Sequence, residues 1–517
     1  MSAVTRARTY VEDRPWLLLL LLAPFLCILP PVPIDETRYL SIAWEMRQSG
    51  DFIALHLNGF AYFDKPPLLF WLLNLQWSLF GTSLWSSRLL SLLCGAGCVA
   101  LVQKLARQLG GADARHAPWL LLGCLYFELF AGVVMFDILL CGCVLLAFTG
   151  GVAWLREGSR AGLALLFAGA ALGMLAKGPV TLLHVLPPLL LARWWLAPAG
   201  ARPSYGRIAA ALAVAVLGAV PVLLWALAAV RHRALADARE LIVTQTAGRV
   251  LESFAHERPP WWYLQWLLPL LLPWPLVLRW RRLGAAFKAA AASSVARFGW
   301  CASVPAFVAF SAVSGKQLHY LLPLLPGLAL WLGEMARLDP RLLHGRRVLA
   351  FCALVLAAIG WTLLHAGVAS VALLLSLLAT LAAAVLAWRA RGVMPERRVA
   401  CVMLLLVVAL LPVIHRLVLA SMDLRGLAAT VVELRQRGVP IVRAGHEPGL
   451  VTFLARLPAP LPTTDDPARW AREHPQGSVL LWSAHALPQD IPPRVRAGNG
   501  WAGLRPAATF APGQGAP

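Results

Sequence analysis

Long, uninterrupted apolar runs are the feature that most constrains how this chain can fold. Several of them reach the roughly 20 residues that a helix needs to cross a hydrocarbon core of about 30 Å. Only helices or a closed barrel satisfy the backbone in lipid, and these runs are continuous rather than alternating, so helices are predicted. Of the 517 residues, 59% are hydrophobic and 14% are charged, a balance outside the soluble range. The sequence predicts an all-α polytopic membrane protein and excludes a soluble enzyme, a disulfide scaffold and a disordered chain.

The apolar runs predict about thirteen membrane-spanning helices, an odd number that puts the two ends of the chain on opposite sides. More than half of the 46 Lys and Arg residues fall in the N-terminal segment and in the short loops on its side. The positive-inside rule makes this side cytoplasmic. No small-residue cleavage site follows the first run before Pro30, so this run is predicted to be a retained helix. The predicted spans are 16–33, 86–108, 117–134, 138–155, 161–176, 178–196, 208–230, 262–280, 298–314, 318–336, 348–366, 367–388 and 399–420.

The basic charge indicates topology rather than a nucleic-acid partner. The formal net charge is +21, but the basic residues recur between apolar runs instead of gathering on one soluble domain. The nine cysteines fall in or beside apolar runs, with no histidine in metal-ligand spacing. We interpret them as small packing residues.

The loops and the tail divide the chain into two predicted domains. A transmembrane domain is expected at 1–420, in which two long outer loops, 34–85 and 231–261, build the site. The tail at 421–517 is expected to be a small domain on the outer side.

The tail carries both helical and strand patterns. Four apolar residues between 424 and 434 recur at helical spacing, and β-type runs follow at 439–442 and 478–482. These patterns predict a compact α/β domain. The last stretch, rich in Gly, Pro and Ala, is predicted to be disordered.

The first outer loop predicts two helices that lie in the membrane interface. Apolar residues from Tyr39 to Met46 recur at helical spacing and Gly50 follows, which predicts an interfacial helix that ends at this glycine and has Asp35 as its N-cap. After a turn-rich stretch, about fifteen apolar residues follow Pro67, too few to span a membrane. They predict a second interfacial or re-entrant helix, with its prolines in the first turn.

Charged residues gather at the predicted outer ends of the helices. Charge near the apolar boundary is costly unless it is paired, binds a ligand or meets water. Each residue alone is also explained as a solvated loop charge or a helix cap, but the set contains both acids and a cationic cluster suited to phosphate. Its members are Asp35, Glu36, Arg38, Asp64, Lys65, Asp137, Lys177, Arg249, His256, Glu257, Arg258, Lys316 and His319.

A lipid-linked phosphate would explain this mixture of charges. Arg or Lys side chains would supply positive charge as a leaving group departs. Carboxylates and an imidazole can hold a divalent metal that neutralises phosphate oxygens. The aromatic residues between Trp261 and Trp266 are interpreted as interfacial anchors.

Three motifs sharpen this interpretation through a resemblance to a known family. The chain resembles, over roughly residues 10–340, the bacterial 4-amino-4-deoxy-L-arabinose lipid A transferases, which are GT-C membrane glycosyltransferases related to the protein O-mannosyltransferases. The motifs are Asp35-Glu36-Thr37-Arg38-Tyr39, Tyr62-Phe63-Asp64-Lys65-Pro66-Pro67-Leu68 and Lys316-Gln317-Leu318-His319-Tyr320-Leu321-Leu322-Pro323.

The resemblance implies a multi-pass protein of the bacterial inner membrane with its active site and C-terminus in the periplasm. It implies an undecaprenyl-phosphate sugar donor, a lipid A or other glycan acceptor, and a divalent metal, Zn, Mn or Mg. Asp64 falls where family members usually have Glu, so the carboxylate is retained on a shorter side chain. The predicted site comprises Asp35 and Asp137 as catalytic residues, Asp64 and His256 as metal ligands, and for the donor Arg38, Tyr62, Lys65, Arg249, Arg258, Lys316, His319 and Tyr320.

Three alternatives stay open at this stage. The same chemistry could glycosylate a protein or a different glycan. A lipid-linked sugar flippase would also need outer charges and kinked helices, although it should carry charged gates on both faces. The role of Asp35 is open as well, since a hydroxyl acceptor needs a general base and a phosphate acceptor needs only positioning.

Overall fold

The computed structural model describes two compact units of the chain. It covers residues 13–510 apart from 112–113, 201, 232–257, 366–376, 446, 484–493, 499 and a few positions between 379 and 392. One unit, here the transmembrane unit, comprises Met1–Phe25, Asp64–Leu69 and Arg88–Leu410. The other, here the loop–tail unit, comprises Leu26–Phe63, Phe70–Ser87 and Leu411–Pro517. Part of the first outer loop therefore groups with the C-terminal tail.

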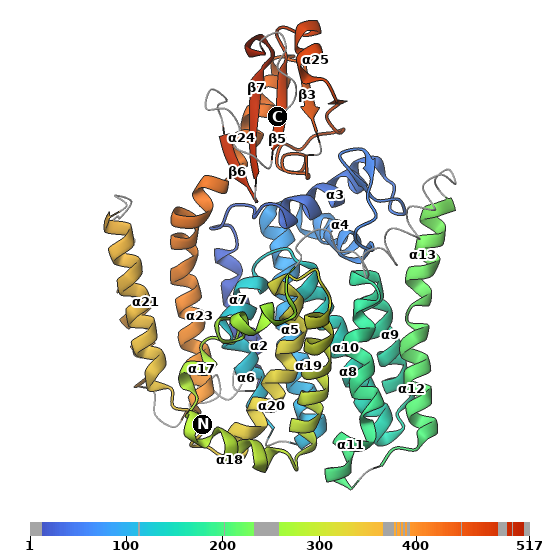
Figure 1. Cartoon of the computed structure of the whole chain (residues 1–517), viewed down its shortest axis with the longest axis vertical. Helices are drawn as coiled ribbons and strands as arrows, with labels where there is room; N and C mark the ends of the chain where they lie inside the picture. The colour runs from blue at the N-terminus through green and yellow to red at the C-terminus, as the bar shows by residue number, and fades with distance from the viewer. Residues whose placement is uncertain are drawn as a thin grey trace. The chain divides into compact units, whose positions relative to one another are not determined.

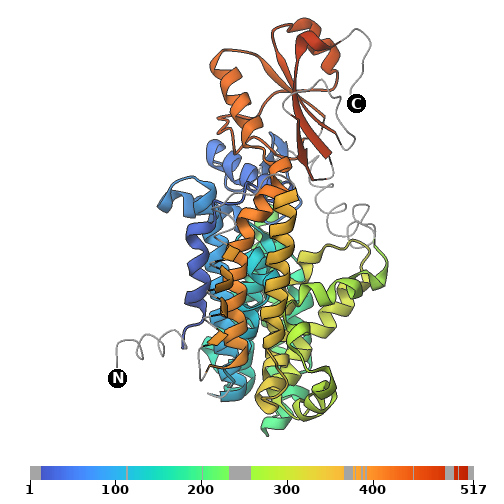
Figure 2. The ribbon, with the colours of Figure 1, turned by 90° about the vertical axis from the view of Figure 1, so that its left-hand side faces the viewer.

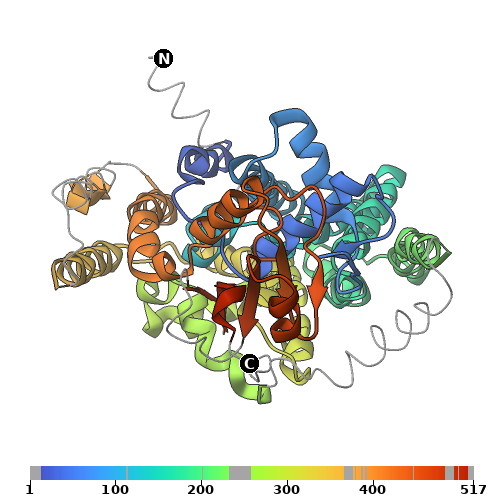
Figure 3. The ribbon, with the colours of Figure 1, turned by 90° about the horizontal axis from the view of Figure 1, so that it is seen from above.

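Long apolar helices dominate the transmembrane unit and run side by side (Figures 1 and 3). Within the described residues, seven helices are long and apolar enough to cross a membrane, or eight if one bent pair counts as a span. The chain is thus a polytopic membrane protein. Five of the seven spans are built on one helix each: α5 (Leu84–Gly110), α8 (Phe136–Glu157), α9 (Arg160–Lys177), α19 (Ser294–Ala312) and α23 (Pro395–Ile414). The other two each join two elements: α12 (Tyr205–Leu217) with α13 (Val220–Arg231), and η6 (Leu318–Leu324) with α20 (Leu325–Leu338). Helix α21 (Arg346–His365) is a further long helix.

Several predicted spans are broken into short helices. Prolines explain two of them, because a proline removes a helical hydrogen bond and crowds the preceding turn. The 16–33 run is helical only to Phe25, and the 262–280 run contains three separate prolines. The 367–388 run lies mostly outside the described residues, so the count of thirteen stays a prediction. The short elements are α2 (Trp16–Leu19), η1 (Leu20–Phe25), α6 (Ala117–Leu122), α7 (Leu125–Ala131), α10 (Val180–Leu190), α11 (Ala192–Leu196), η5 (Pro260–Trp266), α16 (Leu267–Leu270), α17 (Trp274–Val277) and α18 (Trp280–Ala290).

Helices α8 and α9 form a tight antiparallel hairpin. Gly158 ends α8 in the left-handed conformation, and the Ser159 hydroxyl caps α9 by accepting from the Gly162 backbone. Small residues then let the two backbones approach closely. A Cβ atom placed on Gly169 would lie 2.7 Å from the Cys143 carbonyl oxygen, closer than real Cβ contacts. The hairpin brings the start of α8 beside the end of α9.

Both helices predicted in the first outer loop are present, and their placement in the membrane interface stays a prediction. The first is α3 (Asp35–Ser49), which ends at Gly50 with φ +71°, as predicted. The second is α4 (Leu68–Phe80), which begins directly after the two prolines. The N-cap prediction is wrong by one position. Ile34 occupies the N-cap with no side-chain cap, so Asp35 is the first helical residue and its carboxylate is available for other partners.

The tail folds as the predicted α/β domain, with a mixed sheet between two helices (Figure 2). The strand order is β4-β3-β5-β7-β6, parallel across β4-β3-β5 and antiparallel across β5-β7-β6. Successive side chains of the strands point to opposite faces of the sheet. One face packs against the apolar residues of α24, and the other packs against Trp470 of α25. The Gly-rich end is not wholly irregular, since β7 pairs inside the sheet. The elements are α24 (Arg425–Gln436), β3 (Ile441–Ala444), β4 (Thr463–Thr464), α25 (Pro467–Glu473), β5 (Ser478–Ser483), β6 (Arg494–Ala497) and β7 (Gly500–Pro506).

A buried polar network around Asn58 ties the first outer loop to the tail within the loop–tail unit. Asn58 and Gly59 have positive φ and turn the hairpin of β1 (His56–Leu57) and β2 (Phe60–Ala61). The Glu45 carboxylate accepts from both of their backbone N–H groups, at 2.5 and 2.9 Å. The Asn58 amide donates to the Glu447 carboxylate at 2.7 Å and accepts from the Thr452 hydroxyl at 2.9 Å.

An arginine from β3 completes this network. The Arg443 guanidinium donates to the Asn58 carbonyl at 3.1 Å and is only 3% exposed. Burial raises the pKa of the Glu45 and Glu447 carboxyl groups, while their hydrogen bonds and the charge of Arg443 lower it. The network therefore depends on all of its members being satisfied together.

The glycine packing of the α8–α9 hairpin yields a stability prediction. Gly169→Ala is expected to lower the stability by about 1–3 kcal/mol, because the new methyl group meets the α8 backbone. Gly97→Ala is a matched control, since Gly97 also lies in an apolar helix and a Cβ there meets nothing within 4 Å. Thermal unfolding of both variants in detergent measures the difference. Equal melting temperatures would contradict the close backbone approach.

Candidate functional site

A buried ion pair forms the centre of the candidate site in the transmembrane unit. Asp137 lies in the first turn of α8, and its carboxylate contacts the Lys177 ammonium at the end of α9. The Asp137 side chain is 2% exposed and that of Lys177 is 11% exposed. The α8–α9 hairpin positions both groups, since it sets these two helix ends side by side. Each charge compensates the burial of the other.

Two residues of the third motif join this pair. His319 Nε2 lies 3.8 Å from the second carboxylate oxygen of Asp137. The Lys177 ammonium lies over the Tyr320 ring, 4.3 Å from its centroid. Both residues lie in η6, which leads directly into α20. The structure thus brings together three sequence-predicted site residues, Asp137, His319 and Tyr320, around Lys177.

Aromatic residues that the sequence did not assign to the site surround this group. The centroid of the Phe130 ring lies 6.4 Å from that of the His319 ring and 4.6 Å from that of the Tyr126 ring. Tyr263 is fully buried and its hydroxyl donates to the Gln317 carbonyl at 3.1 Å. The interfacial-anchor interpretation is therefore wrong for Tyr263, although it suits the exposed Trp261. Nothing in the apolar sequence around Tyr126 marks it as a site residue.

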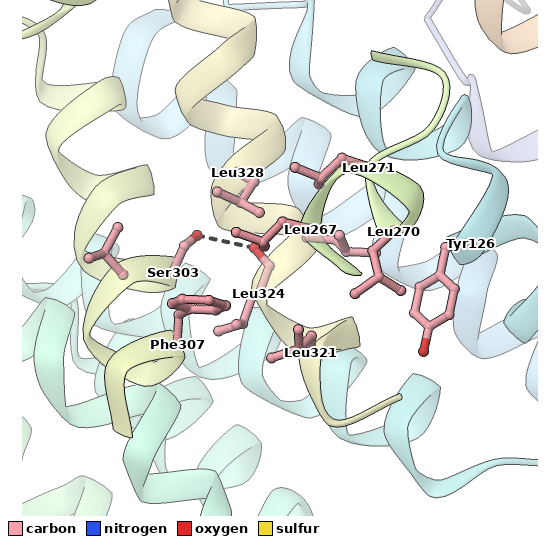
Figure 4. Close-up of a pocket in the computed structure, with 11 residues that line it drawn as sticks. Tyr126, Leu267, Leu270, Leu271, Ser303, Phe307, Leu321, Leu324 and Leu328 are labelled. Atoms are coloured by element: carbon pink, nitrogen blue, oxygen red, sulfur yellow. Dashed lines mark hydrogen bonds between the residues drawn. The ribbon is translucent and has the colours of Figure 1, made fainter. Parts of the chain in front are cut away.

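An apolar cavity lies near the charged group, since Leu321, which follows Tyr320 in η6, is among the residues that line it (Figure 4). Its volume is about 160 Å³, and leucines of α16, η6 and α20 line it together with Phe307 and Tyr126. Figure 4 shows Tyr126 at one end of these leucines. A second apolar cavity, of about 300 Å³, shares Leu271, Leu325 and Leu328 with the first. The two cavities therefore lie beside each other against α20.

Lys316 and Arg258 lie in neighbouring loops of the same unit. The Lys316 ammonium is buried and donates to the backbone carbonyls of Arg258 and Val313. These hydrogen bonds connect the 258–260 segment to the end of α19. Lys316, which was predicted to bind the donor, therefore has a structural role in this part of the chain. Arg258 is exposed, and its guanidinium lies 5.9 Å from the Trp262 ring centroid. It keeps a positive charge at the surface.

The first motif lies on α3 in the loop–tail unit. The Asp35 carboxylate lies 3.9 Å from the Arg38 guanidinium and accepts from the Tyr39 hydroxyl at 3.4 Å. Both charged side chains stay partly exposed, at 38% and 26%. Glu36 is fully buried instead and accepts from the Val32 backbone at 2.8 Å. The two neighbouring acids therefore differ, since only Asp35 faces accessible space.

The second motif follows the hairpin of the first outer loop. Tyr62 is buried, and its ring meets the edge of Phe70 at 6.3 Å. Asp64 and Lys65 lie half-buried between β2 and α4. Arg249 and His256 lie outside the described residues, so their predicted roles stay predictions.

The metal hypothesis depends on a residue beyond the described ranges. Within those ranges, no three His, Cys, Asp or Glu side chains gather so that they could hold a metal ion. The second predicted ligand beside Asp64 is His256, which lies outside the described residues. The divalent metal therefore stays a prediction.

Fold and site define a polytopic α-helical membrane protein with a small α/β tail. Residues 64–229 match the family model described as dolichyl-phosphate-mannose-protein mannosyltransferase. The crystal structure of ArnT from Cupriavidus metallidurans bound to undecaprenyl phosphate has a TM-score of 0.73 at 20% identity, covering 99% of this chain and 100% of that one. Its apo state gives a TM-score of 0.74 at 19% identity with the same coverage. The predicted fold class is confirmed.

The relatives by sequence carry the name undecaprenyl phosphate-alpha-4-amino-4-deoxy-L-arabinose arabinosyl transferase. That of Pseudomonas fluorescens (strain Pf0-1), numbered 1, is 32% identical over 320 residues, which are 58% of this chain and 53% of the relative. That of Pseudomonas aeruginosa (strain UCBPP-PA14) is 33% identical over 317 residues, 58% and 54% of the two chains. The chain spans about half the length of these curated relatives. The resemblance that the three motifs indicated is confirmed.

The Asp137–Lys177 pair yields a double-mutant prediction. Asp137→Asn or Lys177→Gln alone is expected to lower the stability by about 3–5 kcal/mol, because each leaves one buried charge without compensation. The double variant is expected to recover most of that loss, since it buries no charge. Thermal unfolding of the three variants measures the coupling. Lys104→Gln, at an exposed helix position, controls for the loss of a lysine. Additive losses in the double variant would contradict a direct pair.

Proposed function

We propose that this protein is a membrane glycosyltransferase that moves 4-amino-4-deoxy-L-arabinose, or a similar sugar, from undecaprenyl phosphate to lipid A. The observation that carries the proposal is the group of Asp137, Lys177, His319 and Tyr320, in which Asp137 is buried, near two adjacent apolar cavities. A polyprenyl phosphate has the same two parts, a charged head and a long apolar chain. The names of the sequence relatives support this donor.

The residues of the transmembrane unit suit the departing phosphate. The Lys177 ammonium contacts Asp137 and lies over the Tyr320 ring. These contacts hold it in place, so it need not rearrange when negative charge develops on a nearby phosphate. Asp137 is better suited to orient Lys177 and His319 than to act as a general base, because its carboxylate is already shared between two cations or donors. His319 can donate a hydrogen bond to a phosphate oxygen while its other side faces Asp137.

The α3 residues suit the acceptor side of the reaction. Asp35 is accessible, and the Arg38 guanidinium lies 3.9 Å from its carboxylate. If the acceptor is a lipid A phosphate, Asp35 needs only to position it. If the acceptor is a hydroxyl, Asp35 is the candidate general base.

The proposed location is the bacterial inner membrane, with a cytoplasmic N-terminus and a periplasmic site and tail. The basic residues of the short loops support this orientation. A divalent metal held by Asp64 and His256 is part of the proposal, and it would neutralise phosphate oxygens when bound.

Transfer by the Asp35→Asn variant tests the proposal and the role of this acid. Purified protein in nanodiscs is given the undecaprenyl-phosphate sugar and lipid A, and the product is followed by mass spectrometry. The variant is expected to fold normally and lose most transfer, by about 10²–10⁴-fold if a proton must be removed and by less if the acceptor is a phosphate. Asp51→Asn is the matched control, because its oxygen can still accept from Ile53 and Ala54. No transfer by wild type with any acceptor would favour a flippase.

Elemental analysis tests the metal. His256→Ala and Asp64→Asn are each expected to lower bound Zn, Mn or Mg markedly without lowering the melting temperature, since the ion acts on phosphate rather than on the helices. His56→Ala serves as a control in the same outer loop as Asp64. Equal metal content in wild type and all three variants would remove the metal from the proposal.

Reporter fusions test the orientation. Fusions after residues 60 and 430 are expected to be active with a periplasmic reporter, and a fusion after residue 282 with a cytoplasmic one, because the basic loops favour that orientation. A cytoplasmic signal at 430 would overturn the count of thirteen helices.

A further inference from the structure

A segment with basic but no acidic residues begins at Arg279, just before α18, and ends at Arg297 in α19. Arg297 lies near the start of α19, whereas the candidate site lies near the end of that helix. From Arg279 to Arg297 the chain carries five basic residues and no acidic residue. Arg282 is paired with Asp339 through two hydrogen bonds of 2.7 and 3.0 Å. Arg281, Lys288 and Arg297 have no acidic partner among the described residues. The segment therefore presents uncompensated positive charge.

An apolar groove lies directly beside this charge. Its volume is about 510 Å³, and aromatic rings from four elements line it: Trp194 of α11, Phe287 of α18, Trp300 of α19 and Trp331 of α20. Trp194 meets Trp300 edge-on at 5.5 Å, and Phe287 meets Trp331 at 5.6 Å. Arg297 and Phe310, near the candidate site, are thirteen residues apart on α19, so the groove lies about 20 Å from that site along the helix.

Arg297 links the groove to the charge. Its guanidinium donates to the Ala291 carbonyl at 2.7 Å and to the Trp194 carbonyl at 2.9 Å, which holds two walls of the groove together. A guanidinium has five N–H donors, so three remain for a ligand. On α18, Arg281 and Lys288 are seven residues apart and share one face. Both side chains are exposed, and Lys288 directly follows Phe287, whose ring lines the groove.

We propose that this groove binds an acyl chain of an anionic phospholipid, whose phosphate is held by Arg281, Lys288 and Arg297. The occupant is a membrane lipid rather than a soluble anion, because the groove beside the charges is apolar and lies in a membrane protein. The anionic class follows from charge complementarity, since three cations without acidic partners attract a net negative headgroup. The inference is independent of the transfer reaction, because it concerns a different end of the helices.

Lipid binding to purified protein, followed by native mass spectrometry, tests the headgroup. Phosphatidylglycerol is expected to bind with clearly higher affinity than phosphatidylcholine that has the same acyl chains. The Arg281→Gln/Lys288→Gln variant is expected to bind phosphatidylglycerol about tenfold more weakly or worse, since two phosphate-directed charges are lost. Lys104→Gln/Arg160→Gln removes two other exposed charges and is expected to bind as wild type does. Equal binding by both double variants would overturn the proposal.

A groove-filling substitution tests the chain. Ala291→Trp is expected to lose phosphatidylglycerol binding, whereas Ala289→Trp, an exposed position outside the groove, is expected to keep it. Size-exclusion profiles verify that both variants fold. Inorganic phosphate that competes fully with the lipid would reduce the site to an anion site and contradict the role of the groove. Tighter binding of undecaprenyl phosphate, lost in Ala291→Trp, would assign the groove to the carrier and overturn the proposal as well.

Discussion

The compensation of buried charge is the constraint on which the transmembrane unit depends. An isolated carboxylate at the depth of Asp137 costs several kcal/mol, and the Lys177 ammonium offsets that cost only while the two groups stay in contact. Contact requires the end of α9 to return to the start of α8, which the glycine-lined hairpin permits. His319 and Tyr320 then take their places around the pair. Packing of small residues thus determines the electrostatics of the site.

The site combines two environments that rarely occur together. Four polar or charged side chains lie near two leucine-lined cavities that share residues of α20. Neither part alone would select a ligand, because apolar grooves accept any lipid tail and charged groups accept many anions. Together they suit the amphiphilic donor proposed above. In the loop–tail unit, taken by itself, the first motif on α3 carries an accessible acid and a partly exposed arginine.

The sequence predicted the parts of the fold that depend on local pattern. Long apolar runs predicted helices α5, α8 and α9, and shorter apolar patterns in the first outer loop predicted α3 and α4. The 16–33 and 262–280 runs broke because hydropathy does not register the prolines inside them. Asp35 missed the N-cap by one residue, within the usual uncertainty of helix ends. The roles of Tyr126 and Tyr263 were not predictable, because their partners come from other helices and no local signal records them.

The Asn58 network has a consequence for how this protein can be recombined. Arg443 and Glu447 of the tail serve a hairpin nearly four hundred positions earlier in the chain. Both side chains are buried, and the hairpin supplies part of their hydrogen bonding, since Asn58 accepts from Arg443 and donates to Glu447. The tail is therefore not an exchangeable module. A chimera that takes its tail from a relative must take the matching hairpin too, and substitutions at these two places should arise in concert during evolution.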